Sequence, residues 1–186
     1  MANSTTSFLD ELKAATRGCV ALLVGNRQAA SYFDFSQRGL VSSLIAAVIA
    51  VGLAGFGPLL IGVPMPSGAA TESVIVNGLL FVVQALTAYI ALRQMGRQDG
   101  FIPYLVASNW ITLASAVLLL LSTLLGPIGI AVLVLVVILA LTSFINIGRF
   151  IVTLTPMQIG LLFLSQAVGV FVALGFIAVL IGPPVA

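Results

Sequence analysis

Long apolar stretches without a charged side chain alternate with short charged segments along this chain. Residues 39–71, 73–92, 100–148 and 150–186 contain no Asp, Glu, Lys or Arg. A membrane-spanning helix needs roughly 20 apolar residues, each adding about 1.5 Å of length. The pattern therefore predicts several helices that cross a membrane.

Turn-forming residues divide these stretches into five spans. The stretch 100–148 would be about 74 Å long as a single helix, and Gly126-Pro127 near its middle is typical of a helix end followed by a new start. In the first span, several glycines and Pro58 predict a kink or an early end. The expected spans are 40–60, 73–92, 103–125, 128–147 and 157–181.

The seven Lys and Arg residues all fall on one side of such a five-span bundle. Four precede the first span, two lie between the second and third, and one lies between the fourth and fifth. Because basic residues are enriched in cytoplasmic loops, we expect the N-terminus in the cytoplasm and the C-terminus outside. The expected organisation is a cytoplasmic segment, residues 1–38, followed by a transmembrane bundle, residues 39–186.

Residues 7–24 have the pattern of an amphipathic helix. At 100° per residue, Lys13 and Arg17 share one face with Asp10. The opposite face carries Phe8, Leu12, Cys19 and Leu23. Lys13, Arg17 and Arg38 are candidate contacts to acidic lipid headgroups, and packing of this helix on the cytoplasmic ends of the bundle is the alternative. The predicted fold class is all-α: a polytopic bundle of five transmembrane helices plus an N-terminal interfacial helix.

The composition excludes several classes of protein. Hydrophobic residues make up 61% of the chain and charged residues 6%, against about a quarter charged in a soluble domain. This excludes a soluble domain, a disordered chain and a nucleic-acid binder. Cys19 is the only cysteine and there is no His, so we expect no intrachain disulfide and no metal site. Membrane lipids are the expected partners.

No ionisable side chain lies near the middle of a predicted span. Glu72, the nearest, falls at the outer end of the second span, where a solvated loop carboxylate is expected. Proton relays and ion-coupled carriers need such a group inside the bilayer, and membrane hydrolases need a base, paired carboxylates or a metal. We therefore expect no enzyme activity, no catalytic residue and no cofactor.

Neutral polar residues are the remaining candidates for chemistry inside the membrane. Asn77 and Gln84 lie seven residues apart on the second span, so they face the same way, while Asn109 lies on the third span and Asn146 on the fourth. Hydrogen bonds between helices are one interpretation. A polar path lined by these four side chains is the other. The fifth span adds Gln158 and Gln166.

Small residues at four-residue spacing predict close helix contacts. Ala46, Ala50 and Ala54 lie on the first span, and Gly169 and Ala173 on the fifth. Such residues let helix backbones approach each other. We expect contacts within the bundle, with a homodimer face as the alternative.

Other residues have the character of lipid-facing positions. Tyr32, Phe33 and Phe35 before the first span, and Trp110 in the third, suit the membrane interface. Residues 130–141 are almost purely aliphatic, so the fourth span is expected to face lipid widely.

The layout resembles the Yip family of small five-helix membrane proteins. A basic amphipathic N-terminal helix precedes five closely spaced spans with very short outer loops. Tyr32-Phe33-Asp34-Phe35-Ser36 and Asn109-Trp110 also resemble segments of uncharacterised bacterial inner-membrane proteins with this layout. Eukaryotic Yip proteins are linked to vesicle traffic and small GTPases, a role that implies a longer cytosolic region than the 38 residues here. The resemblance implies a role in the cell envelope.

Two functions follow as hypotheses. The first is a non-catalytic integral protein of the cytoplasmic (inner) membrane that organises, assembles or modulates partners, either another membrane protein or a second copy of itself. The second is a small carrier or channel for a neutral or lipid-like solute, lined by Asn77, Gln84, Asn109 and Asn146.

Overall fold

The computed structural model describes residues 7–181, which form an all-helical bundle. The N-terminal helix is α1 (Phe8–Leu23). The long helices that follow are α2 (Gln37–Leu60), α3 (Ala69–Gln94), α4 (Phe101–Thr123), α5 (Gly129–Asn146) and α6 (Pro156–Ile181). Five segments built on these helices are long and apolar enough to cross a membrane. The predicted fold class is confirmed, and the architecture is that of a multi-pass membrane protein.

Short segments connect the helices. Three are 3-10 turns: η1 (Arg27–Tyr32), η2 (Gln98–Gly100) and η3 (Gly126–Ile128). Gly126 has a φ of 55°, a conformation that glycine adopts without strain, and the predicted break between the third and fourth spans is confirmed there. The connection from α5 to α6 begins with a π-helix, η4 (Ile147–Ile151), which continues α5 directly, and the loop 61–68 joins α2 to α3.

Helix α2 does not end early, so that part of the expectation for Pro58 is wrong. The helix continues through Pro58 to Leu60. Proline has no backbone N–H, so the carbonyl of Ala54 loses the donor that a regular helix would supply. The hydroxyl of Ser73, on α3, donates a hydrogen bond to that carbonyl at 3.2 Å. The neighbouring helix thus supplies the missing donor.

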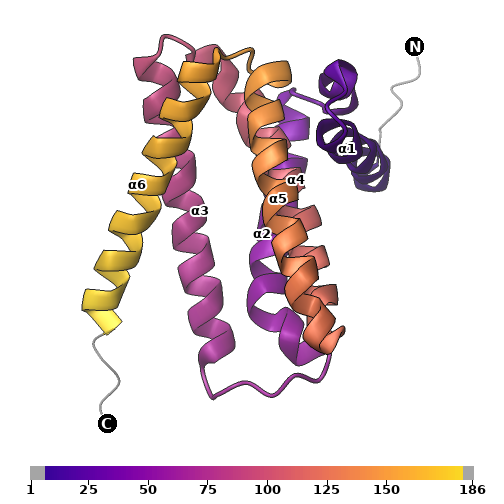
Figure 1. Cartoon of the computed structure of the whole chain (residues 1–186), viewed down its shortest axis with the longest axis vertical. Helices are drawn as coiled ribbons and strands as arrows, with labels where there is room; N and C mark the ends of the chain where they lie inside the picture. Colours follow the sequence, from indigo (N-terminus) through magenta and orange to yellow (C-terminus); the bar gives the residue numbers. More distant parts are fainter. Residues whose placement is uncertain (1–6, 182–186) are drawn as a thin grey trace.

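Helix α6 diverges from α5 toward the end opposite η4, whereas α3 stays packed on α2 (Figure 1). Helix α6 packs along α3, while α4 packs against both α2 and α5. Helix α1 lies beside the end at which α2 begins, and the loop from α2 to α3 closes the opposite end. Helices α5 and α6 are joined through η4 but diverge from it.

Charge separates the two ends of the bundle. One end contains α1, the start of α2, and the α3–α4 and α5–α6 connections, and we call it the basic end (Figure 1). It carries all seven basic residues: Lys13, Arg17, Arg27, Arg38, Arg93, Arg97 and Arg149. Glu72 is the single charged residue of the opposite end within the described range.

Most of the small residues singled out from sequence lie inside the bundle. Ala46 and Ala50 of α2 are buried. Gly169 of α6 lies so close to α3 that a Cβ there would be 2.5 Å from Cγ2 of Thr87. Ala54 is exposed in the described chain and lines a cavity. Ala46, Ala50 and Gly169 are thus at internal positions, as their spacing predicts, whereas Ala54 is not buried.

Helix α5 presents a wide aliphatic surface outward. Ile130 is 73% exposed, and Leu133, Val134, Val137 and Ile138 are also exposed. Val136, on the opposite face, is buried. These exposed side chains are consistent with the expected broad exposure of this span to lipid.

Candidate functional site

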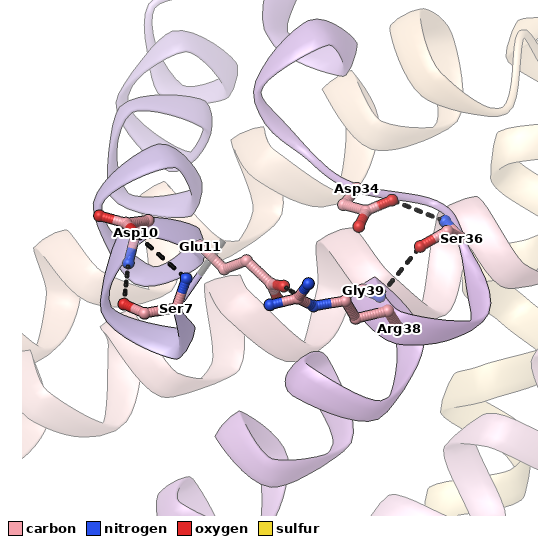
Figure 2. Close-up of polar contacts among 7 residues, drawn as sticks. All are labelled: Ser7, Asp10, Glu11, Asp34, Ser36, Arg38 and Gly39. Carbon is pink, nitrogen blue, oxygen red and sulfur yellow. Dashed lines mark hydrogen bonds and ion pairs between the residues drawn. The ribbon is translucent and has the colours of Figure 1, made fainter. Parts of the chain in front are cut away.

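Helix α1 is fixed to the basic end of the bundle through its apolar face. Ser7 caps it, accepting a hydrogen bond from the Asp10 backbone while the Asp10 carboxylate accepts one from the Ser7 backbone (Figure 2). Leu22 is completely buried. The rings of Phe8 and Trp110 lie 5.9 Å apart. One face of α1 therefore packs on the end of the bundle, which was the alternative to a helix that contacts only lipid headgroups.

The aromatic residues near this end are mostly not at a lipid interface. Trp110 is 4% exposed, because α1 covers it, and Phe33 is 7% exposed. A Cβ on Gly18 of α1 would lie 2.6 Å from the Phe33 ring, so the glycine makes room for that ring. The interfacial role expected for Trp110 and Phe33 is wrong, whereas Tyr32 is exposed.

An ion pair joins α1 to the start of α2. Oε1 of Glu11 lies 3.2 Å from Nε of Arg38, and Figure 2 shows the two side chains reaching toward each other across the gap between the helices. The Glu11 side chain is 11% exposed and that of Arg38 48%. Nearby, Ser36 caps α2 by accepting from the Gly39 backbone. Arg38 is thus engaged with protein, although half its surface is open to a headgroup.

The remaining two headgroup candidates are exposed. Lys13 and Arg17 lie on the outer face of α1. The same helix exposes two large apolar side chains, Leu9 and Val20, which lie on the same face about three turns apart because 11 residues separate them. A surface that combines basic and apolar side chains is typical of helices at a membrane interface.

Two of the four predicted polar-path residues have structural roles. Nδ2 of Asn109 on α4 donates to Oγ of Ser43 on α2 at 3.2 Å, and both residues are buried. Nδ2 of Asn146 on α5 donates to the carbonyl of Leu22 at 2.7 Å and so holds the C-terminal end of α1. The structure does not bring these two side chains into a path with the other two.

Asn77 and Gln84 meet at one site. Both line a cavity of about 410 Å³ bounded by α2, α3 and α4. Ala47, Ala50 and Ala54 form its α2 wall. The α4 wall carries three polar side chains, Thr112, Ser115 and Thr123, among apolar ones.

The cavity contains polar groups that lack a partner within the described chain. Nδ2 of Asn77 donates to the carbonyl of Ser73 at 2.8 Å, but no hydrogen bond joins its side-chain oxygen to another residue in the range 7–181. Over the same range, none involves the Gln84 amide or the Ser115 hydroxyl. Thr112 and Thr123 donate to carbonyls of their own helix. An amide in an apolar setting is stabilised by a polar partner, so these groups suit a bound polar atom.

The α4 side of this cavity was missed at the sequence level. Thr112, Ser115 and Thr123 lie on one helical face, together with Ala116, Leu119 and Leu120. Their spacing of three, four, seven, eight and eleven residues from Thr112 is a signal that could have identified the face. The polar candidates predicted from the sequence were Asn and Gln residues, so the Thr and Ser hydroxyls of α4 were not among them.

Arg97 makes a contact that no sequence pattern indicated. Its guanidinium donates to the carbonyl of Thr153 at 2.9 Å, to Oγ1 of Thr153 at 2.8 Å and to the carbonyl of Val152. Thr153 has a φ of 57°, which is unfavourable for a β-branched residue. Arg97 thereby fixes the strained α5–α6 connection to the α3–α4 connection.

Two further polar contacts involve the Gln residues of α6. Gln166 donates to the hydroxyl of Tyr104 on α4 at 2.6 Å. Gln158 and Thr155 form reciprocal side-chain to backbone hydrogen bonds at the start of α6. Both glutamines therefore stabilise the fold.

Burial alters the acidity of the single thiol. Cys19 lies on the inner face of α1, and its desolvation raises its pKa to about 12. Over residues 7–181, no group of three or more Cys, Asp or Glu side chains is placed to hold a metal ion.

Comparison with known proteins adds no family to these observations. No family model matches the chain, and no curated protein or solved structure is significantly similar to it. The resemblance to Yip proteins stays a prediction.

Proposed function

We propose that this chain is a non-catalytic membrane protein that binds a neutral, lipid-like molecule in the cavity between α2, α3 and α4. The observation that carries the proposal is the pair of amide side chains, Asn77 and Gln84, on one face of α3 and lining that cavity. Their unpartnered polar atoms offer both a donor and an acceptor to a ligand.

The chemistry of the cavity wall favours an uncharged ligand. The lining residues are apolar except for amides and hydroxyls, and none is charged. Burying an ion without a counter-charge is costly. A molecule with an apolar body and a hydroxyl, ester or amide group matches this wall.

The size of the cavity also fits a small-molecule site. Pockets that bind small ligands typically have volumes of roughly 300–1,000 Å³, and this one, which is open on one side, has a volume of about 410 Å³. Ala47, Ala50 and Ala54 create the space because their side chains stop at Cβ. Binding and release of such a molecule is also what a carrier for a neutral solute requires.

The distribution of charge supports placement in a cytoplasmic membrane with the basic end in the cytoplasm. An additional role in organising partner proteins remains a prediction, supported by the exposed basic and apolar face of α1.

Ligand binding is tested with a photoactivatable diacylglycerol analogue and purified protein in lipid nanodiscs. We expect the crosslinked peptides to come from α2, α3 and α4. The double variant Asn77→Leu/Gln84→Leu should lower labelling of these peptides about tenfold, since loss of two hydrogen bonds of about 0.5–1.5 kcal/mol each weakens binding by that order.

The matched control is Gln94→Leu, which makes the same kind of change at the end of α3, outside the cavity. Thermal unfolding measured by circular dichroism verifies that each variant is folded. Equal labelling of the double variant and wild type, or labelling spread evenly over all helices, would overturn the proposal.

A further inference from the structure

A second apolar recess lies between α5 and α6, separate from the cavity of α2, α3 and α4. It has a volume of about 570 Å³. Its α5 wall is formed by Leu141, Phe144 and Ile145, and its α6 wall by Pro156, Ile159, Gly160 and Phe163. The rings of Phe144 and Phe163 lie 5.8 Å apart, edge to face, so the two walls meet there. We call this recess the α5–α6 groove.

The groove has a basic residue at one end. Arg149 lines it and lies in the π-helix η4, at the basic end of the bundle. From Arg149 to Leu141 a helix would advance about 12 Å. A groove of this length can accept the part of a lipid acyl chain that lies next to the headgroup. The groove therefore runs from the interface toward the apolar middle of the bundle.

Arg149 has no acidic partner among the residues described. The two ion pairs found in the range 7–181 are Glu11–Arg38 and Arg97–Asp99. Asp10 and Asp34 accept hydrogen bonds from backbone N–H groups near α1 and α2, and Glu72 lies at the opposite end. The guanidinium of Arg149 lies 5.3 Å from the centre of the Phe150 ring, and over residues 7–181 its N–H groups make no ion pair with an acidic side chain.

We propose that the α5–α6 groove binds one anionic phospholipid, with its phosphate on Arg149 and an acyl chain between α5 and α6. Positive charge at the mouth of an apolar recess complements a molecule that is anionic at one end and apolar at the other. Basic pockets between transmembrane helices bind anionic headgroups on the same principle. The occupant differs from that of the first cavity in charge and location.

Gly160 is the residue that keeps the groove open. A Cβ at this position would meet no atom within 4 Å, so a side chain there would extend into free space. Gly160→Leu should fill the groove without straining the helix. Gly175→Leu is its matched control, because Gly175 also lies exposed on α6, has the same free surroundings and does not line the groove.

The test measures binding of spin-labelled phosphatidylglycerol and phosphatidylcholine to purified protein reconstituted in nanodiscs. Wild type should prefer phosphatidylglycerol. Arg149→Gln should weaken its binding about fivefold, the contribution of one basic residue near an anionic headgroup, and leave phosphatidylcholine unchanged. Gly160→Leu should lower the binding of both lipids, and Gly175→Leu should match wild type.

Arg93→Gln separates a specific site from general attraction to the basic end, since Arg93 also lies at that end, on α3, but does not line the groove. It should bind phosphatidylglycerol as wild type does. The proposal is overturned if Arg93→Gln and Arg149→Gln have equal effects, if Gly160→Leu binds both lipids like wild type, or if wild type shows no preference for phosphatidylglycerol. If Gly160→Leu does not fold, the two arginine variants decide the question.

Discussion

Neutral polar side chains inside the bundle fall into two groups according to their partners. Asn109 and Asn146 are committed to hydrogen bonds that join elements of the fold. Gln84 and the oxygen of Asn77 line a cavity, without a partner within the described chain. Residue type and helical spacing predicted that Asn77 and Gln84 face the same way. The partners of Asn109 and Asn146 are distant in sequence, so no local pattern could reveal them.

Cys19 provides a residue-scale prediction. Because burial raises its pKa to about 12, the thiolate that reacts with maleimides is scarce at neutral pH. At about pH 8, labelling of Cys19 in the folded protein should be slower by on the order of a hundredfold or more than after unfolding in detergent.

The contribution of the buried neutral thiol to stability is complete below pH 9, the unperturbed pKa of a thiol, and is lost as the pH rises through about 12.

The control for this measurement is Val20→Cys in a Cys19→Ser background, since Val20 is exposed on the same helix. It should react rapidly in the folded protein. Rapid reaction of Cys19 itself would show that the inner face of α1 is open to reagent.

At the scale of elements, apolar length and turn residues were sufficient to predict five spans and their approximate limits. The start of α3 was the largest difference, at Ala69 rather than Ser73, because the charge of Glu72 is tolerated within the first turn of a helix. The π-helix η4 and the contact of Arg97 with Thr153 were not predictable. Both depend on how two connections meet in space.

The attachment of α1 is testable through Asn146. Asn146→Leu keeps the side-chain size but removes the hydrogen bond to the Leu22 carbonyl, which is worth about 1 kcal/mol. Separation of α1 from the bundle should become more frequent, and Cys19 should react with maleimide about fivefold faster.

Asn109→Leu is the comparison, because Asn109 contacts α2 through Ser43 rather than α1. It should lower the thermal stability of the bundle with a smaller effect on Cys19. Identical labelling rates in the two variants would contradict a specific role of Asn146.

At the scale of the whole molecule, charge divides the bundle into a basic end and an opposite end with one acidic residue (Figure 1). That division was predictable, since it needs only the order of spans and charges. The divergence of α6 from α5 was not, because it depends on the packing of α6 along α3, which is distant in the chain. The α5–α6 groove arises from that divergence.

The orientation of the bundle is tested by cysteine labelling in a Cys19→Ser background. Ser67→Cys, in the loop between α2 and α3, should react with a membrane-impermeant maleimide added to intact cells. Gln98→Cys, in η2, should react only after the membrane is opened. Labelling of the Gln98→Cys variant in intact cells would contradict the expected orientation and indicate the opposite one.

The hydrogen bond from Ser73 to Ala54 has a consequence for how the protein enters its membrane. A backbone carbonyl left without a donor in hydrocarbon costs several kcal/mol, and Pro58 creates such a carbonyl on α2. Helix α2 inserted alone carries that cost until α3 arrives. The loop between them is short, so the two helices are suited to leave the insertion machinery together. We therefore expect α2 and α3 to partition into lipid as one hairpin during biosynthesis, before the later helices assemble on it.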